Sequence, residues 1–208
     1  MNPLKTTTTV TRKTTESEIA VKLTLGELAP DYRSKINTSL MFLNHMLEHI
    51  AYRSGINLEV SVTLDKFDLT HVVAEDVGMT FGKAVADLVS NNVPTGYGDA
   101  IGIIDEAKAS VAISFEGRAL FDFTFGGTQL AEQVEGMYTD DILTFLDGFA
   151  QGASATLHVD ILKGENGHHI WEAAFRAIGT ALGRALYVDP TRAGLTAGVA
   201  GRINYEIQ

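Results

Sequence analysis

A pattern that repeats after 97 residues constrains the fold of this chain more than any other feature. His71 and Glu75 recur as His168 and Glu172, 97 positions further on. The apolar spacing of both halves predicts the same order of strand, strand, helix, strand, helix. The strand before each histidine matches at this offset, with Val60, Val62 and Leu64 against Leu157, Val159 and Ile161. We interpret the repeat as an internal duplication, the alternative being chance likeness between two ordinary α+β units.

The duplication predicts an α+β fold of two ββαβα halves, residues 1–95 and 96–208, joined in one compact domain. We expect two sheets side by side, with helices packed on one face. Apolar periods of two and of three to four place a hairpin in 6–25, strands at 56–64, 107–116, 118–125 and 154–162, and helices at 39–53, 71–89, 139–152 and from 168 onward. Gly117 joins the two middle strands, and Ile203, Tyr205 and Ile207 alternate like an added strand.

The composition narrows the classes of partner and of metal ligand. The chain has no cysteine, which excludes disulfides and thiolate ligands and fits a reducing compartment. A net charge of −10 disfavours nucleic acid and anionic membranes as partners, because phosphate binding needs clustered cations. The sequence shows neither an apolar leader nor a stretch of membrane-spanning length. We therefore expect a soluble, cytoplasmic protein, for which a small anionic substrate remains open.

The histidines and glutamates at the helix starts form the most specific chemical pattern. Residues three or four apart share one face of a helix, so His168, His169 and Glu172 can converge. His71 and Glu75 repeat this spacing in the first half. Imidazole and carboxylate together suit Mn, Fe or Zn, and the repetition indicates paired metal sites. Three further histidines remain: His158 on the polar face of a strand, His45 on the first helix, and His49, which we interpret as structural.

The chain resembles the imidazoleglycerol-phosphate dehydratase family of histidine biosynthesis from about Arg12 to Asp189. The likeness rests on "RKTTESEI", "FLNHMLEHIA", "HVVAEDVGMTFGKAV", "DEA", "EGR", "TLHV", "GENGHHIWEAAFRA" and "YVDP". It implies two similar halves, a homo-oligomeric shell of 24 subunits and two manganese ions per site, held by ligands from neighbouring subunits. The implied activity is a hydro-lyase reaction on an imidazole-containing small molecule.

The resemblance also implies roles for individual residues. Glu16 matches an acid-base glutamate near the substrate, and Arg118 and Arg176 match cations that bind its phosphate. In the family the metal stabilises the substrate's imidazole as an anion while water leaves, and a positioned carboxylate moves protons. The implied metal ligands are His45, His71, Glu75, His158, His168, His169 and Glu172.

Four departures from the family pattern fall in the implied site. Val72 replaces a histidine ligand, so one ion instead of two is possible. Asn44 replaces an aspartate beside His45, a change that can alter how that histidine is oriented. Gly96 stands where the family has an arginine, and the stretch around Ala200 has no lysine. The lost cations weaken the expected hold on a phosphate group.

Three interpretations of function follow from these observations. The first is a working imidazoleglycerol-phosphate dehydratase with a divergent pocket. The second is a paralogue that keeps the fold and a metal but acts on another imidazole-like or hydroxylated substrate. The third is a non-catalytic assembly protein, for which Val72 is the main argument. The pattern of ligands favours a metal-dependent carbon-oxygen lyase.

Overall fold

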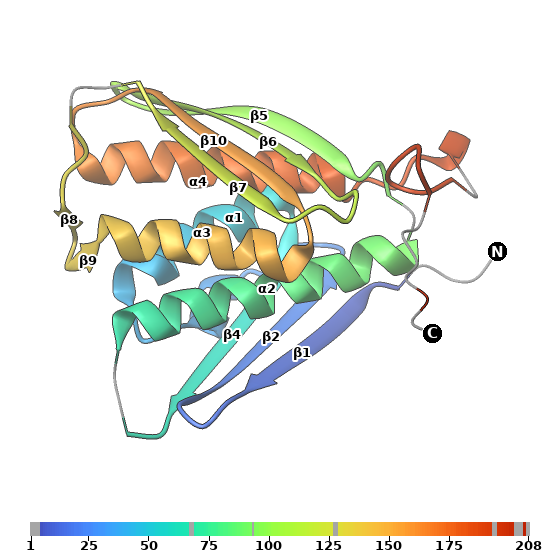
Figure 1. Ribbon diagram of the computed structural model, residues 1–208, viewed down its shortest axis with the longest axis horizontal. Coiled ribbons are helices and arrows are strands. Elements are labelled where there is room, and N and C mark those ends of the chain that lie inside the picture. The colour runs from blue at the N-terminus through green and yellow to red at the C-terminus, as the bar shows by residue number, and fades with distance from the viewer. Residues whose placement is uncertain are drawn as a thin grey trace.

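The computed structural model describes residues 5–66, 69–92, 94–126, 129–192, 195–201 and 206. It has three layers, in which helices lie between two four-stranded sheets (Figure 1). The expected strand formed by Ile203, Tyr205 and Ile207 lies outside the described residues. Among the described residues, no helix combines the length and the apolar character that crossing a membrane requires.

The first half forms the sheet at the bottom of Figure 1, which we call sheet A. Its strands are β1 (Thr7–Lys13), β2 (Ser17–Leu25), β3 (Ile36–Asn37) and β4 (Ile56–Leu64), in the order β1-β2-β4-β3. A 3-10 turn, η1 (Tyr32–Lys35), precedes β3, and the helices are α1 (Met41–Ser54) and α2 (Thr70–Asn92). β2 pairs antiparallel with both β1 and β4, whereas β3 runs parallel to β4. The two outer strands, β1 and β3, therefore run in the same direction.

The second half repeats this topology in sheet B, at the top of Figure 1. Its strands are β5 (Tyr97–Ile104), β6 (Ala107–Ser114), β7 (Leu120–Phe125) and β10 (Thr156–Lys163), in the order β5-β6-β10-β7. Here too the last pair, β10 with β7, is the parallel one. The remaining elements are the ribbon β8 (Gln133–Val134) and β9 (Met137–Tyr138), the helices α3 (Thr139–Ala153) and α4 (Gly167–Ala185), and the turn η2 (Pro190–Arg192). Matching strand order and direction confirm the predicted duplication.

The arrangement of the sheets differs from the prediction in one respect. Helices cover one face of each sheet, as expected, but the sheets lie on opposite sides of the helical layer and not side by side (Figure 1). α2 packs on β1 and β2 of its own sheet and on α3 of the other half, and α4 packs on β5 and β6 and on α1. Because burial on both sides requires a neighbour on both sides, the helices form the middle of the molecule.

The sequence did not predict strand β5, and β7, which follows β6 in the chain as expected, does not pair with it in the sheet. The hairpin partner of β6 is β5, and β10 lies between β6 and β7. Gly98 and Gly102 lower the strand propensity of β5. A Cβ at either position would overlap a backbone carbonyl of α4, at Ala181 or Ala173. The glycines therefore allow α4 to pack directly on the strand.

Glycines also set the close contact between helices of the two halves. A Cβ at Gly82 of α2 would overlap the carbonyl oxygen of Phe149 in α3, and a Cβ at Gly152 of α3 would overlap that of Met79 in α2. Gly78 and Gly148 make similar approaches. The backbones of α2 and α3 therefore touch without intervening side chains.

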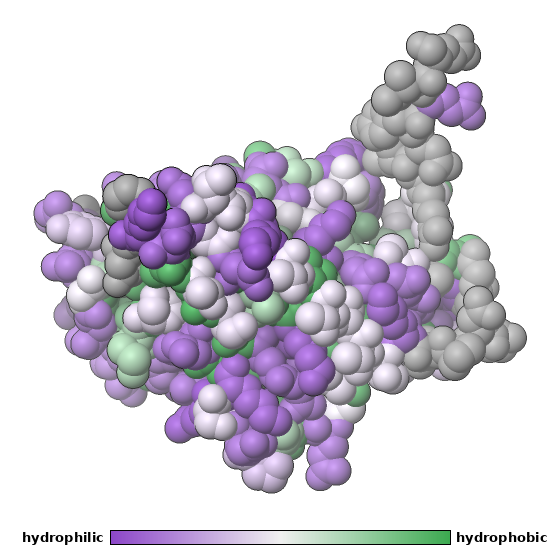
Figure 2. All heavy atoms as spheres, turned by 90° about the horizontal axis from the view of Figure 1, so that it is seen from below, coloured by the Kyte–Doolittle hydropathy of each residue, from purple (hydrophilic) through white to green (hydrophobic). Residues whose placement is uncertain are grey.

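The outer faces of the sheets are polar because the strands alternate. In β2, Ile19, Val21 and Leu23 are fully buried under the helices, and the intervening residues are exposed or partly buried. Figure 2 views the molecule from the side on which sheet A lies and shows mainly hydrophilic side chains with scattered apolar ones. The alternation confirms the half-buried strands predicted from the sequence.

Candidate metal centre

The crossing of α1 and α4 places the side chains of the centre. A Cβ at Gly179 of α4 would lie 2.9 Å from the Cα of Ile50 in α1, and one at Gly183 would lie 3.1 Å from the Cα of Ser54. The first distance is shorter than real Cβ contacts and the second is unusually short, so the two helices approach closely along these glycines. The approach brings one helix from each half of the chain together.

The first turn of α4 is held by its N-cap, Asn166. The side-chain oxygen of Asn166 accepts the backbone N–H groups of His168 and His169 at 2.9 and 3.3 Å. Asn is among the strongest N-cap residues because it satisfies these otherwise unpaired donors. The helix therefore begins about where the sequence predicts, and both imidazoles lie in its first turn.

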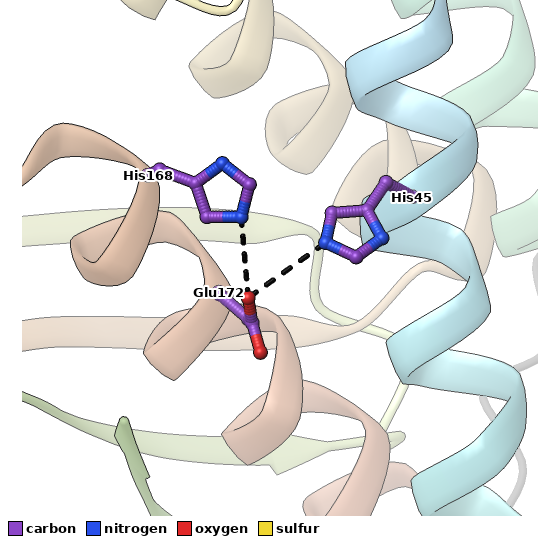
Figure 3. A group of neighbouring side chains, drawn as sticks. All are labelled: His45, His168 and Glu172. Carbon is purple, nitrogen blue, oxygen red and sulfur yellow. Dashed lines mark hydrogen bonds and ion pairs between the residues drawn. The ribbon is translucent and has the colours of Figure 1, made fainter. Parts of the chain in front are cut away.

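His45, His168 and Glu172 converge at this crossing (Figure 3). Their candidate ligand atoms all lie within 4.8 Å of one another. Nε2 of His168 is 3.2 Å from Oε2 of Glu172, and Nε2 of His45 is 3.7 Å from the same oxygen. Two imidazole nitrogens and one carboxylate oxygen are a donor set suited to Mn, Fe or Zn. The chemistry and the spacing both fit a divalent cation.

Each imidazole of this cluster has a carboxylate near its other nitrogen. Nδ1 of His45 lies 3.6 Å from Oε2 of Glu48, and Nδ1 of His168 lies 3.3 Å from Oε1 of Glu135. Glu135 and Gly136 both have positive φ and form the turn of the β8–β9 ribbon. A carboxylate that bonds to the second ring nitrogen of a metal-ligating histidine fixes the orientation and the tautomer of the ring. Both rings consequently present Nε2 to Glu172.

Glu172 is buried, with 7% of its side chain exposed. Its Oε1 accepts a short hydrogen bond from Arg176, which also donates to the carbonyl of Ile103 at 3.0 Å. Burial raises the pKa of Glu172, but the charges of His49 and Arg176 outweigh burial and leave the pKa lowered. Burial lowers the pKa of His49 to about 4. At neutral pH the relevant positive charge is therefore that of Arg176, and Glu172 is ionised.

His169 points to a different carboxylate, that of Glu106. Nδ1 of His169 lies 2.8 Å from Oε2 of Glu106, and Nε2 lies 3.7 Å from Oδ2 of Asp105. Oε1 of Glu106 accepts the backbone N–H groups of Glu165 and Asn166 at 3.2 and 2.9 Å. The bond from the Asn166 backbone and that from His169 lower the pKa of Glu106 to about 2. Glu106 thus ties the loop before α4 to the ring of His169.

We expect the Glu106→Gln substitution to lower the pKa of His169. The hydrogen bond to Glu106 is the largest cause of the raised pKa of this histidine, and an amide removes the charge that favours the imidazolium. Because the folded-state pKa is raised above 6.5, this pairing stabilises the fold below about pH 6.5 and is lost as pH rises through the raised value. NMR titration of the imidazole in metal-free protein measures the change. The Asp105→Asn variant is the control, and an equal shift in both variants would contradict the assignment to Glu106.

The other implied ligands lie outside the three-residue cluster. His71 and Glu75 are exposed on α2, and Nδ1 of His71 lies 3.7 Å from Oδ1 of Asp141 at an open pocket of about 600 Å³. His158 lies on β10, with Nδ1 3.2 Å from Oδ2 of Asp122 on β7. Like His169, these imidazoles have a neighbouring carboxylate and partly exposed rings.

Glu16 and Val72 also stand apart from the cluster. Glu16 is exposed in the turn between β1 and β2, where its backbone bonds to Thr14 and Asp65. Val72 is partly buried in the first turn of α2, beside His71. An aliphatic side chain offers no ligand atom at this position.

Both arginines that were expected to bind phosphate have a carboxylate partner in the described residues. Arg118 is 73% exposed and lies 3.7 Å from Glu116, while Arg176 is engaged with Glu172 as described above. Gly96 has φ +68, and a Cβ there would overlap Ala197 of the C-terminal segment. A side chain at this position would therefore be strained by the backbone and would require Ala197 to move.

His49, predicted to be a structural histidine, lies beside the cluster. In the structure its ring contacts that of His45, with centroids 4.7 Å apart, and its Nε2 lies 3.3 Å from Oε1 of Glu172. The spacing of one turn between His45 and His49 was the signal that could have indicated the place of His49.

The side chain of Asn44 bonds to the backbone and hydroxyl of Thr38 at 2.8 and 2.7 Å and so fixes the start of α1.

Comparisons with known proteins agree with the residues described above. The family model "Imidazoleglycerol-phosphate dehydratase" matches residues 38–182. The relative from Ralstonia pickettii (strain 12J) is 37% identical over 93% of this chain and 97% of its own, and that from Burkholderia multivorans is 38% identical over 89% and 93%. Both are imidazoleglycerol-phosphate dehydratases.

The structural relatives are of the same kind. The crystal structure of IGPD from Pyrococcus furiosus in complex with (S)-C348 is 30% identical, with a TM-score of 0.74 over 93% of this chain and 99% of that one. The Staphylococcus aureus enzyme is 28% identical, with a TM-score of 0.72 over 88% of this chain and 100% of that one. With its sequence, its duplicated topology and its histidine-rich helix starts in agreement, the chain belongs to the imidazoleglycerol-phosphate dehydratase family.

Proposed function

We propose that the chain is a metal-dependent dehydratase whose centre is formed by His45, His168 and Glu172. The observation that supports this most strongly is the convergence of their ligand atoms within 4.8 Å in a chain of this family. Manganese is the metal that we propose, since two imidazoles and a carboxylate accommodate it and the family resemblance implies it. A bound divalent cation supplies Lewis-acid stabilisation of negative charge on the substrate.

The chain's own residues have separable tasks in this proposal. Glu48 and Glu135 orient the imidazoles of His45 and His168 through Nδ1. Arg176 keeps Glu172 ionised and directs its Oε2 towards them. Glu16 is proposed as the group that moves protons on the substrate, because it is an exposed carboxylate at the matching family position.

The remaining ligands are proposed to act between subunits. His71, Glu75, His158 and His169 lie apart from the cluster, at partly or fully exposed positions from which a neighbouring copy can be reached. We propose a homo-oligomer of 24 subunits, as the resemblance implies, in which these residues complete further coordination. The absence of cysteine from the sequence suits the reducing cytoplasm, which we propose as its location.

We expect removal of the metal to abolish dehydration of imidazoleglycerol phosphate and added Mn²⁺ to restore it. Metal binding should also stabilise the fold, by about 2.7 kcal/mol at a free ion concentration of 100 Kd. Turnover assays and thermal unfolding before and after chelation measure both effects, with Mg²⁺ as the control ion because it prefers all-oxygen ligands. Full turnover after complete chelation would refute the proposed mechanism.

A second candidate is an enzyme of the same reaction type that takes a non-phosphorylated substrate. It is favoured by the packing of Ala197 against Gly96 and by the pairing of Arg118 with Glu116. Turnover of the phosphorylated and dephosphorylated imidazole glycerols under equal metal loading distinguishes the two. A higher kcat/KM for the dephosphorylated compound supports this candidate, and the reverse supports the phosphate-specific enzyme.

A further inference from the structure

His49 is mostly buried, yet it is not one of the three residues of the proposed metal cluster. Its side chain is 17% exposed, and its ring packs edge-on against His45 at an angle of 69°. Its Nε2 is buried and makes no hydrogen bond within the described residues. The charged group within reach of this nitrogen is Oε1 of Glu172, at 3.3 Å.

The two oxygens of Glu172 have separate surroundings. Oε2 faces the ligand nitrogens of His45 and His168, at 3.7 and 3.2 Å. Oε1 faces Arg176 and His49. A carboxylate oxygen can accept more than one hydrogen bond, so the guanidinium and an imidazole N–H can share Oε1. The arrangement leaves Oε2 as the oxygen available to a cation.

The two contacts to Oε1 restrain Glu172 in different ways. Arg176 lies one turn further along α4 and also bonds to Ile103 of β5, so its contact restrains Glu172 relative to elements of the second half. His49 belongs to α1 and lies one turn after His45. A bond from His49 to Oε1 therefore restrains the carboxylate relative to the helix that supplies His45.

We propose that His49 is a positioning residue that donates its Nε2–H to Oε1 of Glu172 and thereby holds Oε2 towards His45 and His168. The inference rests on the proposed metal centre and deepens it. A buried imidazole N–H without an acceptor is unfavourable, and an ionised carboxylate is its strongest acceptor, so both groups gain from the bond. A small rotation of the ring converts the 3.3 Å contact into a hydrogen bond.

The test compares Mn²⁺ affinity in full-length wild type, His49→Leu and His49→Gln, by calorimetry together with the Mn²⁺ EPR spectrum. Substitution of a residue that orients a metal ligand typically lowers metal affinity by 10–100-fold. We therefore expect the Leu variant to bind Mn²⁺ roughly 10–100-fold more weakly. The Gln variant carries an amide N–H in nearly the same place and should bind within about threefold of wild type. The Ile50→Val variant, buried on the same helix, is the control for stability alone.

The outcomes separate this inference from the proposed function. If wild type binds Mn²⁺ and His49→Leu binds it with the same affinity, the inference is overturned and the proposed metal centre is not. A Gln variant that binds Mn²⁺ as weakly as the Leu variant leads to the same conclusion. A wild-type protein that binds no Mn²⁺ overturns the centre and the inference together. Weakened binding in Ile50→Val equal to that in His49→Leu would assign the effect to helix packing, and the positioning role would fall.

Discussion

Glu172→Gln should reduce the dehydratase activity by about 10²–10³-fold and abolish tight Mn²⁺ binding. The carboxylate is the proposed anionic ligand of the cluster, and both imidazoles face its Oε2. Glutamine keeps the volume but offers a neutral oxygen, which binds a divalent cation much less strongly. Lewis-acid stabilisation is worth several kcal/mol, and about 3–4 kcal/mol corresponds to this loss of rate.

The matched control for this variant is Glu59→Gln, on β4, whose carboxylate pairs with Lys22 at the surface. Metal content after dialysis and kcat/KM at saturating Mn²⁺ are the quantities to compare. The control should retain wild-type values in both. If Glu172→Gln kept its metal and lost less than about tenfold in kcat/KM, equivalent to about 1.4 kcal/mol, the carboxylate would not be a ligand.

Gly152→Ala should destabilise the fold by about 3 kcal/mol, which lowers the Tm by about 6–12 °C for a chain of this size. The new methyl group would overlap the carbonyl oxygen of Met79, and a helical backbone cannot give way as a side chain does. Alanine favours a helix over glycine by about 1 kcal/mol, which offsets only part of the overlap. The two halves would have to separate along α2 and α3.

Gln151→Ala tests whether helix propensity alone explains the result. Gln151 is exposed on the same helix, one residue before Gly152, so the substitution changes propensity without touching α2. Its Tm should stay within about 2 °C of wild type, because exposed substitutions usually change stability by less than 0.5 kcal/mol. Thermal unfolding followed by circular dichroism compares the variants, and a Gly152→Ala protein as stable as wild type would show that the helices have room between them.

Local periodicity in the sequence was sufficient for most of the fold. Alternation in β2, β4 and β10 and the helical spacing of α1 to α4 were all predicted, because one buried face imposes its period on each element. The placement of the sheets on opposite sides of the helices was not predicted. It depends on contacts between halves, such as Gly152 against Met79, which join residues far apart in the chain.

In the site, too, residues on one helix could be predicted from their spacing, whereas the residues contributed by a second helix could not. The pair His168 and Glu172 follows from spacing on one helix. The addition of His45 and His49 depends on how closely α1 approaches α4, which is set by Gly179 and leaves no periodic signal. The resemblance to a family implied His45, and the one-turn spacing from His45 was the local signal that could have indicated His49.

The connection between α2 and β5 divides the centre between two pieces of chain. His45 precedes this connection, and His168 and Glu172 follow it. If the polypeptide were cut there, neither fragment would contain a complete set of donors. A divalent cation would then bind only to the reassembled pair, so complementation between the fragments should be driven by the ion as well as by their apolar surfaces.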